Sequence, residues 1–145
     1  KLSAKSDSKA MEIGCGSGLV TMVLSTLGWE VTSCDVNPFA IACTRGNLEA
    51  NGLSGRASII EADFESDFHI PEDTELVVWN LPYLNENEEN SGVLEKIEEA
   101  AWADIPEGGW GGVLLKSLEN SRSNLSENII VIMVMMITLE LRQNL

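Results

Sequence analysis

The sequence predicts an α/β protein with a doubly wound, mostly parallel sheet. Short apolar runs alternate along the chain with longer stretches of helical periodicity. A glycine-rich turn follows the first apolar run, and an acidic residue ends the second and follows the third. Because parallel strands end at one edge of a sheet, these residues are expected to share the edge where such sheets bind ligands.

The composition is that of a single soluble domain. The chain has 145 residues, of which 44% are hydrophobic and 22% are charged. Residues 1–9 lack the apolar core of a secretory signal and are predicted to form a flexible leader, so that the domain spans residues 10–145. Three cysteines without a CxxC pair indicate reduced thiols in a cytoplasmic protein and no metal site.

The net charge of −14, from 23 acidic and 9 basic residues, disfavours broad binding to phosphate backbones. Such acidity also keeps proteins soluble in concentrated salt, and the sequence does not separate the two explanations. Residues 85–107 hold eight of the acids and a single lysine. This acidic stretch is either a solvated helix face or a docking surface for a basic protein.

The first predicted strand, residues 9–13, runs into a turn with three alternating glycines, Gly14, Gly16 and Gly18. Glycine adopts positive φ without strain and lets a ligand lie against the backbone. The spacing is GxGxG, not the GxGxxG of dinucleotide-binding proteins, and Glu12 precedes it. A carboxylate there would repel a pyrophosphate and attract a cation, so a cationic nucleoside-like cofactor fits better than NAD. The alternative is a tight turn without a ligand.

A helix is expected over residues 17–27, ended by Gly28, and a second strand over residues 30–35. That strand ends on Asp35, seventeen residues after the last glycine of the turn. A carboxylate at this place can accept hydrogen bonds from both hydroxyls of a ribose. Alternatively, it caps the next helix, which a proline starts and which is predicted over residues 38–50.

The third strand is predicted over residues 57–62 and is followed by Asp63 and Phe64. The carboxylate could accept a hydrogen bond from the exocyclic amine of an adenine, while the aromatic ring packs on the face of the base. The alternative is that Asp63 only caps the loop.

The fourth predicted strand, residues 76–79, is apolar throughout, as a strand covered on both faces should be. The motif Asn80, Leu81, Pro82, Tyr83 follows it at the same edge as the glycine turn. An asparagine amide both donates and accepts, proline fixes the backbone, and tyrosine offers a flat face. Together these residues could hold a planar NH2 group; the alternative is an ordinary turn.

Beyond this motif, the sequence predicts a loop around the glycine pairs of residues 108–112, a helix over residues 113–118 and a linker over residues 120–126. A fifth strand is predicted over residues 128–136. The longest apolar run, residues 129–137, is too short to cross a membrane, so we expect a fully buried central strand there and no membrane association.

Taken in order, these motifs resemble a class I S-adenosylmethionine-dependent methyltransferase, which has a Rossmann-like fold. Segments 35–40 and 47–52 are similar to the HemK (PrmC) group. Ala101 and Trp102 with the glycines that follow them are similar to its short archaeal and eukaryotic type. The resemblance covers residues 9–136. That family continues through two further strands, so the sheet here is expected to lack the last strands.

The resemblance implies S-adenosylmethionine as the cofactor. The glycines would line its methionine part, and Glu12 would lie near its amino acid end. Asp35 would bind the ribose, and Asp63 with Phe64 would hold the adenine. The complete implied set of cofactor contacts is Glu12, Gly14, Cys15, Gly16, Gly18, Asp35, Val36, Asp63, Phe64 and Asn80. The implied catalytic set, which holds the acceptor NH2 group, is Asn80, Leu81, Pro82 and Tyr83.

The acceptor implied by the HemK group is a glutamine side-chain amide of a protein, with a translation release factor as substrate and a small zinc-binding activator subunit as partner. Leu81 stands where that group has a proline, and Asn-Leu-Pro-Tyr also occurs in enzymes that methylate adenine N6 in ribosomal RNA. An N6-adenine RNA or DNA methyltransferase is therefore the alternative. The acidity makes nucleic acid the less favoured partner. A third hypothesis is a cofactor-binding domain without an acceptor site.

Overall fold

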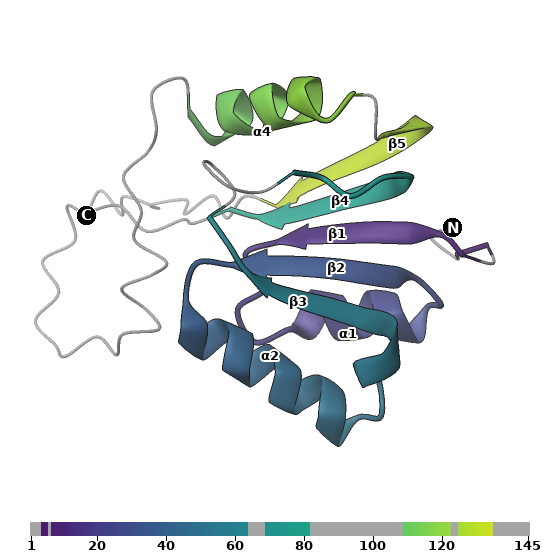
Figure 1. Cartoon of the computed structure of the whole chain (residues 1–145), viewed down its shortest axis with the longest axis vertical. Coiled ribbons are helices and arrows are strands. Elements are labelled where there is room, and N and C mark those ends of the chain that lie inside the picture. Colours follow the sequence, from purple (N-terminus) through teal and green to yellow (C-terminus); the bar gives the residue numbers. More distant parts are fainter. Residues whose placement is uncertain (1–3, 6, 64–68, 82–108, 123–124, 135–145) are drawn as a thin grey trace, which may run out of the picture.

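The computed structural model describes residues 4–5, 7–63, 69–81, 109–122 and 125–134. They form one five-stranded sheet in the order β3-β2-β1-β4-β5, in which every neighbouring pair is parallel. Figure 1 shows α1 and α2 beside the β1 to β3 half of this sheet, and α4 beside β4 and β5. The elements are β1 (Lys9–Ile13), α1 (Leu19–Thr26), β2 (Glu30–Asp35), α2 (Pro38–Ala50), η1 (Ser54–Arg56), β3 (Ala57–Glu61), β4 (Thr74–Asn80), α4 (Gly109–Asn120) and β5 (Leu125–Val134).

Two helix ends follow directly from local sequence. α1 ends in a Schellman motif, because Gly28 takes a φ of 95° and the N–H groups of Gly28 and Trp29 donate to the carbonyls of Ser25 and Leu24. α2 starts at Pro38, and the side chain of Asn37 accepts a hydrogen bond from the Phe39 N–H at 2.9 Å. The N-cap of α2 is therefore Asn37 and not Asp35, which was the alternative role predicted for that carboxylate.

Each face of the sheet buries an apolar cluster. One cluster joins Met11, Val77 and Trp79 to Leu114 of α4. The other joins alternate residues of these strands to Leu24 of α1 and to Trp29, which follows that helix. Since neighbouring strand residues point to opposite faces, α4 and α1 cover opposite faces of the sheet. β4 contributes to both clusters, which confirms the prediction that it is covered on both sides.

The order of the strands reverses at β1, because β2 and β3 lie on one side of it and β4 and β5 on the other. In doubly wound sheets this switch point, at the carboxyl ends of the strands, is where ligands bind. The fold class predicted from the sequence is confirmed.

Several predicted boundaries are wrong. Residues 109–112 lie in α4 and not in a loop, so that helix starts earlier and ends later than predicted, and β5 begins within the predicted linker. Within the described part of the chain β5 is an edge strand, with Ile130 and Met133 exposed, and not the fully buried central strand that its composition indicated.

The flexible leader stays a prediction, and its last two residues contact the sheet. Ser8 is buried and its carbonyl accepts a hydrogen bond from the Glu30 N–H at 3.0 Å, and Lys9 is already part of β1. None of the helices within the described ranges is long and apolar enough to cross a membrane.

Candidate functional site

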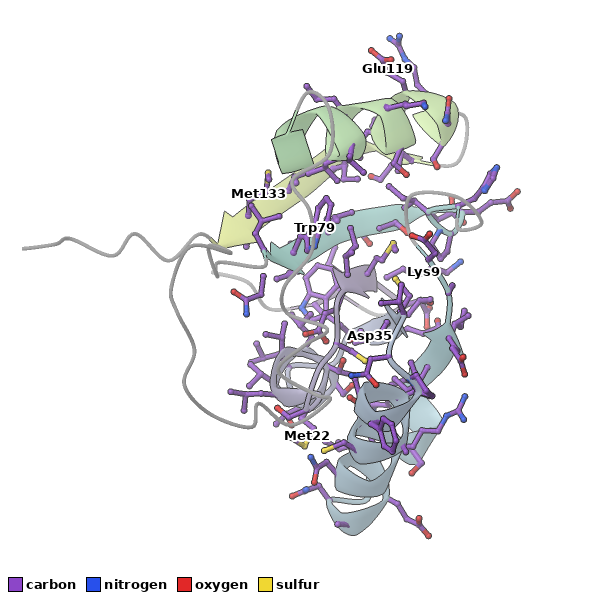
Figure 2. All side chains as sticks on the ribbon, turned by 90° about the vertical axis from the view of Figure 1, so that its left-hand side faces the viewer. Lys9, Met22, Asp35, Trp79, Glu119 and Met133 are labelled. Carbon is purple, nitrogen blue, oxygen red and sulfur yellow. The ribbon has the colours of Figure 1, made fainter. Side chains whose placement is uncertain are left out.

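The register of the sheet brings three predicted site residues into one row. Ile13 of β1 lies opposite Cys34 of β2 and Trp79 of β4. The next residues along these strands are Gly14, Asp35 and Asn80, which therefore lie side by side at the carboxyl ends of β1, β2 and β4. Figure 2 looks onto this edge, with Asp35 and Trp79 labelled near its centre. The row spans the switch point of the sheet.

The glycine turn between β1 and α1 is held open by its backbone. Gly14, Gly16 and Gly18 have φ values of 71°, 52° and 80°, which only glycine adopts without strain. The N–H groups of Gly14 and Cys15 both donate to the Cys34 carbonyl, at 2.9 and 3.1 Å. A Cβ atom at Gly14 or Gly16 would meet no other atom of the described residues within 4 Å, so the turn borders open space in this part of the structure.

Asp35 connects this turn to α2. One carboxylate oxygen, Oδ2, accepts a hydrogen bond from the Gly16 N–H at 2.9 Å, and Oδ1 accepts one from the Asn37 N–H at 2.9 Å. The residue is half-buried. Each carboxylate oxygen can accept more than one hydrogen bond, so Asp35 can still bind a ribose hydroxyl.

The opposite side of the turn rests on α2 through two residues that the sequence did not single out. Thr44 Oγ1 donates to the Gly16 carbonyl at 3.1 Å, and Asn47 Nδ2 donates to the Ser17 carbonyl at 2.8 Å. The signal for them was their spacing of three, which places both on one face of the helix. Without the tertiary structure, nothing indicated that this face meets the turn.

Glu12 is almost completely buried, with 3% of its surface exposed. It accepts a short hydrogen bond from Thr21 Oγ1 of α1, and Thr21 Oγ1 lies 2.7 Å from Ser33 Oγ of β2. Because the Thr21 hydroxyl has a single hydrogen, Ser33 donates to Thr21. Burial raises the pKa of the Glu12 carboxyl from 4.5 to about 7; the hydrogen bonds from Thr21 oppose this rise, and the charge of Asp35 adds to it.

The charge and shape of the site fit the expected cofactor. Among the described residues, no lysine, arginine or histidine forms an ion pair with Glu12. A ligand that carries a positive charge would supply a cationic partner for the buried carboxylate of Glu12. The open space along Gly14 and Gly16 and the carboxylate of Asp35 suit the rest of a nucleoside.

The family of methyltransferase small domains matches residues 1–137 of this chain. The chain belongs to this family. Ribosomal RNA small subunit methyltransferase C of Alcanivorax borkumensis is 29% identical over 101 residues, which are 70% of this chain and 30% of that protein. The protein of the same name from Serratia proteamaculans is 36% identical over 77 residues, 52% of this chain and 21% of the relative.

Ribosomal protein L11 methyltransferase of Campylobacter fetus is 29% identical over 105 residues and overlaps 62% of this chain and 37% of that protein. The chain thus spans between 21% and 37% of the length of these three relatives.

Two solved structures share the fold over 90% of this chain. One is a candidate rRNA methylase from Clostridium thermocellum, with a TM-score of 0.63, 22% identity and 63% of its own chain covered. The other is a methyltransferase from Geobacter sulfurreducens in complex with S-adenosyl-L-homocysteine, with a TM-score of 0.60, 15% identity and 42% of its chain covered. The family match confirms the expected class I methyltransferase domain and its S-adenosylmethionine cofactor, and the two solved structures confirm the fold.

The remaining predicted contacts of this methyltransferase domain are spread along the same edge. Asp63 lies two residues beyond β3, whose last residue pairs with Asp35, and both Asp63 and Val36 are exposed. Phe64 lies outside the described residues. An adenine site formed by Asp63 and Phe64 therefore stays a prediction.

The acceptor motif is described only in its first half. Asn80 ends β4 with an exposed side chain, whereas the Leu81 side chain is buried in the cluster under α4. Pro82 and Tyr83 lie outside the described residues, as does the acidic stretch of residues 85–107. The first residue of the motif thus lies at the switch point of the sheet.

The buried thiols of the methyltransferase domain are unsuited to attack a substrate. Burial raises the pKa of Cys15 to about 11 and that of Cys34 to about 12. Thr44 Oγ1 lies 3.4 Å from the Cys15 sulfur. Because only the thiolate is a good nucleophile, both cysteines serve as packing groups beneath the turn.

Proposed function

We propose that the protein is an S-adenosylmethionine-dependent N-methyltransferase that methylates a planar amino group held at Asn80. The observation that carries this proposal is the row formed by Gly14, Asp35 and Asn80 at the carboxyl ends of β1, β2 and β4. This row would place the cofactor's reactive carbon beside an amide that can hold an NH2 group.

The bound cofactor supplies an electrophilic methyl group on a sulfonium. Transfer of this methyl group to an acceptor nitrogen would break its bond to sulfur, leave S-adenosylhomocysteine and release a proton from the nitrogen to solvent. The side-chain oxygen of Asn80 accepts a hydrogen bond from the NH2 group, which turns the nitrogen lone pair towards the methyl group. The glycine turn and Asp35 hold the methionine part and the ribose. No side-chain nucleophile takes part, which agrees with the protonated state of Cys15 and Cys34.

The first candidate acceptor is an exocyclic amine of a nucleobase in ribosomal RNA. Supporting this choice, the Alcanivorax and Serratia relatives are named ribosomal RNA small subunit methyltransferase C. The Asn-Leu-Pro-Tyr motif, which departs from the HemK pattern at Leu81, is compatible with the same acceptor class.

The second candidate is the glutamine amide of a protein, which the likeness to the HemK group implied together with a release factor substrate and an activator subunit. It is favoured by the net charge of −14, because an acidic surface suits a basic protein better than RNA. The Campylobacter relative is named a ribosomal protein methyltransferase. The HemK likeness itself stays a prediction.

The test is a labelling experiment with tritiated S-adenosylmethionine. The protein is incubated separately with small ribosomal subunits, with deproteinised ribosomal RNA and with purified release factor, and label is counted in each acceptor. Asn80→Ala is the inactive variant, and Asp73→Asn, at an exposed acid far from the switch point, is the matched control. Label in RNA that disappears in Asn80→Ala supports the first candidate. Label in release factor alone replaces it with the second, and no label in any acceptor contradicts N-methyl transfer to both classes.

A further inference from the structure

We propose that Thr44 and Asn47 of α2 are positioning residues of the cofactor site, which set the conformation of the glycine turn by binding its carbonyl groups. The inference rests on the proposed cofactor. It goes beyond the residues that touch the ligand, because these two side chains act through the backbone of Gly16 and Ser17.

Thr44 is the stronger of the two contacts. Its side chain is fully buried, at 0% exposure, and Oγ1 lies 3.1 Å from the Gly16 carbonyl oxygen and 3.4 Å from the Cys15 sulfur. The hydrogen bond to the Gly16 carbonyl is partly buried, so water can replace a lost hydroxyl only in part. Removing the hydroxyl would therefore leave a half-buried carbonyl without its protein partner, which is costly. The turn would relieve this cost by rotating the peptide unit that follows Gly16.

Close packing holds the same part of the turn against α2. A Cβ atom at Gly18 would lie 2.7 Å from Cγ2 and 3.1 Å from Cα of Thr44. The end of the turn therefore touches the helix directly, and glycine is required there for space as well as for its φ of 80°. Any movement of Thr44 is transmitted to Gly18.

Asn47 adds a second bond one helical turn further on. Its Nδ2 donates to the Ser17 carbonyl at 2.8 Å. This side chain is only half-buried, so water can partly replace it. Its contribution is expected to be smaller than that of Thr44.

A closed ring of contacts links these bonds to the proposed ribose site. The turn donates to Asp35 through the Gly16 N–H, and Asp35 accepts from Asn37, the N-cap of α2. α2 then returns to the turn through Thr44. One helix thus sets both the turn that would hold the methionine part and the carboxylate that would hold the ribose.

The experiment measures the Kd for S-adenosylhomocysteine by calorimetry and the Tm, on the whole chain. Thr44→Val keeps the shape of the side chain and removes the hydroxyl, and Thr44→Ser restores it. The matched control is Thr74→Val, because Thr74 is 1% exposed and its Oγ1 donates to the Pro71 carbonyl at 2.7 Å at the opposite end of the sheet. We expect Thr44→Val to raise the Kd about tenfold, Thr44→Ser to stay within about twofold of the wild type, and Thr74→Val to lower the Tm without changing the Kd.

A Kd for Thr44→Val within about threefold of the wild type would overturn the proposal, and so would an equal rise for Thr74→Val, because the effect would then be general loss of stability. If Thr44→Val does not fold, Asn47→Ala decides: a Kd raised about threefold or more supports the positioning role, and a smaller change overturns it. Absence of binding by the wild type would instead contradict the proposed cofactor site, so the two failures are distinguishable.

Discussion

The two halves of the candidate site are built in different ways. On the β1 and β2 side, the glycine turn is bound by Asp35, by the carbonyl of Cys34 and by two side chains of α2. On the β4 side, Asn80 presents an exposed amide that makes no side-chain hydrogen bond within the described part of the chain. The cofactor half of the candidate site, which comprises the glycine turn and Asp35, is thus held in place by hydrogen bonds before a ligand binds. In the acceptor half, which is Asn80, the side-chain amide would receive its hydrogen-bond partner from the substrate.

The sharpest test of this difference is Asn80→Ala. We expect the rate of methyl transfer to fall about 1000-fold, because the acceptor nitrogen loses the group that orients it. The Kd for S-adenosylhomocysteine should stay within about threefold of the wild type, since the cofactor half does not depend on the amide. Labelling rates and calorimetry measure the two quantities. A large loss of cofactor affinity would show that the halves are not independent.

In the cofactor half, Gly18→Ala should lower the free energy of unfolding by about 3 kcal/mol. An alanine at this position would have a strained positive φ, and its methyl group would clash with Thr44. Gly16→Ala is the matched control. It has the same kind of backbone strain, but its methyl group would meet no atom of the described residues within 4 Å, so a loss of about 1 kcal/mol is expected. Urea unfolding of both variants measures the difference. Equal losses would mean that α2 does not confine the turn.

Glu12 makes the stability of the cofactor half depend on pH. Its pKa is raised in the folded protein, so its favourable contribution is complete below pH 4.5 and is lost as the pH rises to about 7. The wild type should lose about 3 kcal/mol over this interval relative to Glu12→Gln, which keeps an acceptor for Thr21 but does not titrate. Unfolding curves of both proteins between pH 4 and pH 8 provide the comparison. Parallel pH profiles would refute the burial of a titrating carboxyl.

Asp35→Asn should raise the Kd for S-adenosylhomocysteine about tenfold, because a neutral amide weakens the hydrogen bonds to Gly16 and to a ribose and adds a donor where an acceptor is needed. Asp73→Asn serves as control, since Asp73 is an exposed acid at the opposite end of β4 that contacts Lys9 at 3.6 Å. Calorimetry on both variants decides. If both bind like the wild type, the second strand contributes no carboxylate to the ligand.

The elements of the cofactor half were predicted more accurately than those that follow β4. β1, β2 and α2 have the predicted bounds, because strong local signals mark them: a glycine turn, an acid at a strand end, an asparagine and proline at a helix start. In α4, by contrast, glycines 109, 111 and 112 indicated a loop. Packing of Val113, Leu114 and Leu118 against the sheet outweighs the poor helix propensity of those glycines.

β5 shows the same limit at the level of the sheet. Its composition indicated a fully buried strand, because every residue from Ile129 to Val134 is apolar. Its position at the edge of the described sheet depends on which strands pair, and pairing is a long-range property that local composition does not contain.

The sequence by itself determined the order of the elements, the α/β class, the open glycine turn and the polar residues at the strand ends, since each depends on neighbours within a few positions. Only the tertiary structure decided that β4 lies beside β1, so that Asn80 lies next to Gly14, and that Glu12 is buried with Thr21. It also revealed Thr44 and Asn47, whose bonds to the turn join residues 28 and 30 positions apart. Such contacts form when the apolar faces of helices and strands are buried together. No local sequence pattern shows which distant residues this burial brings into contact.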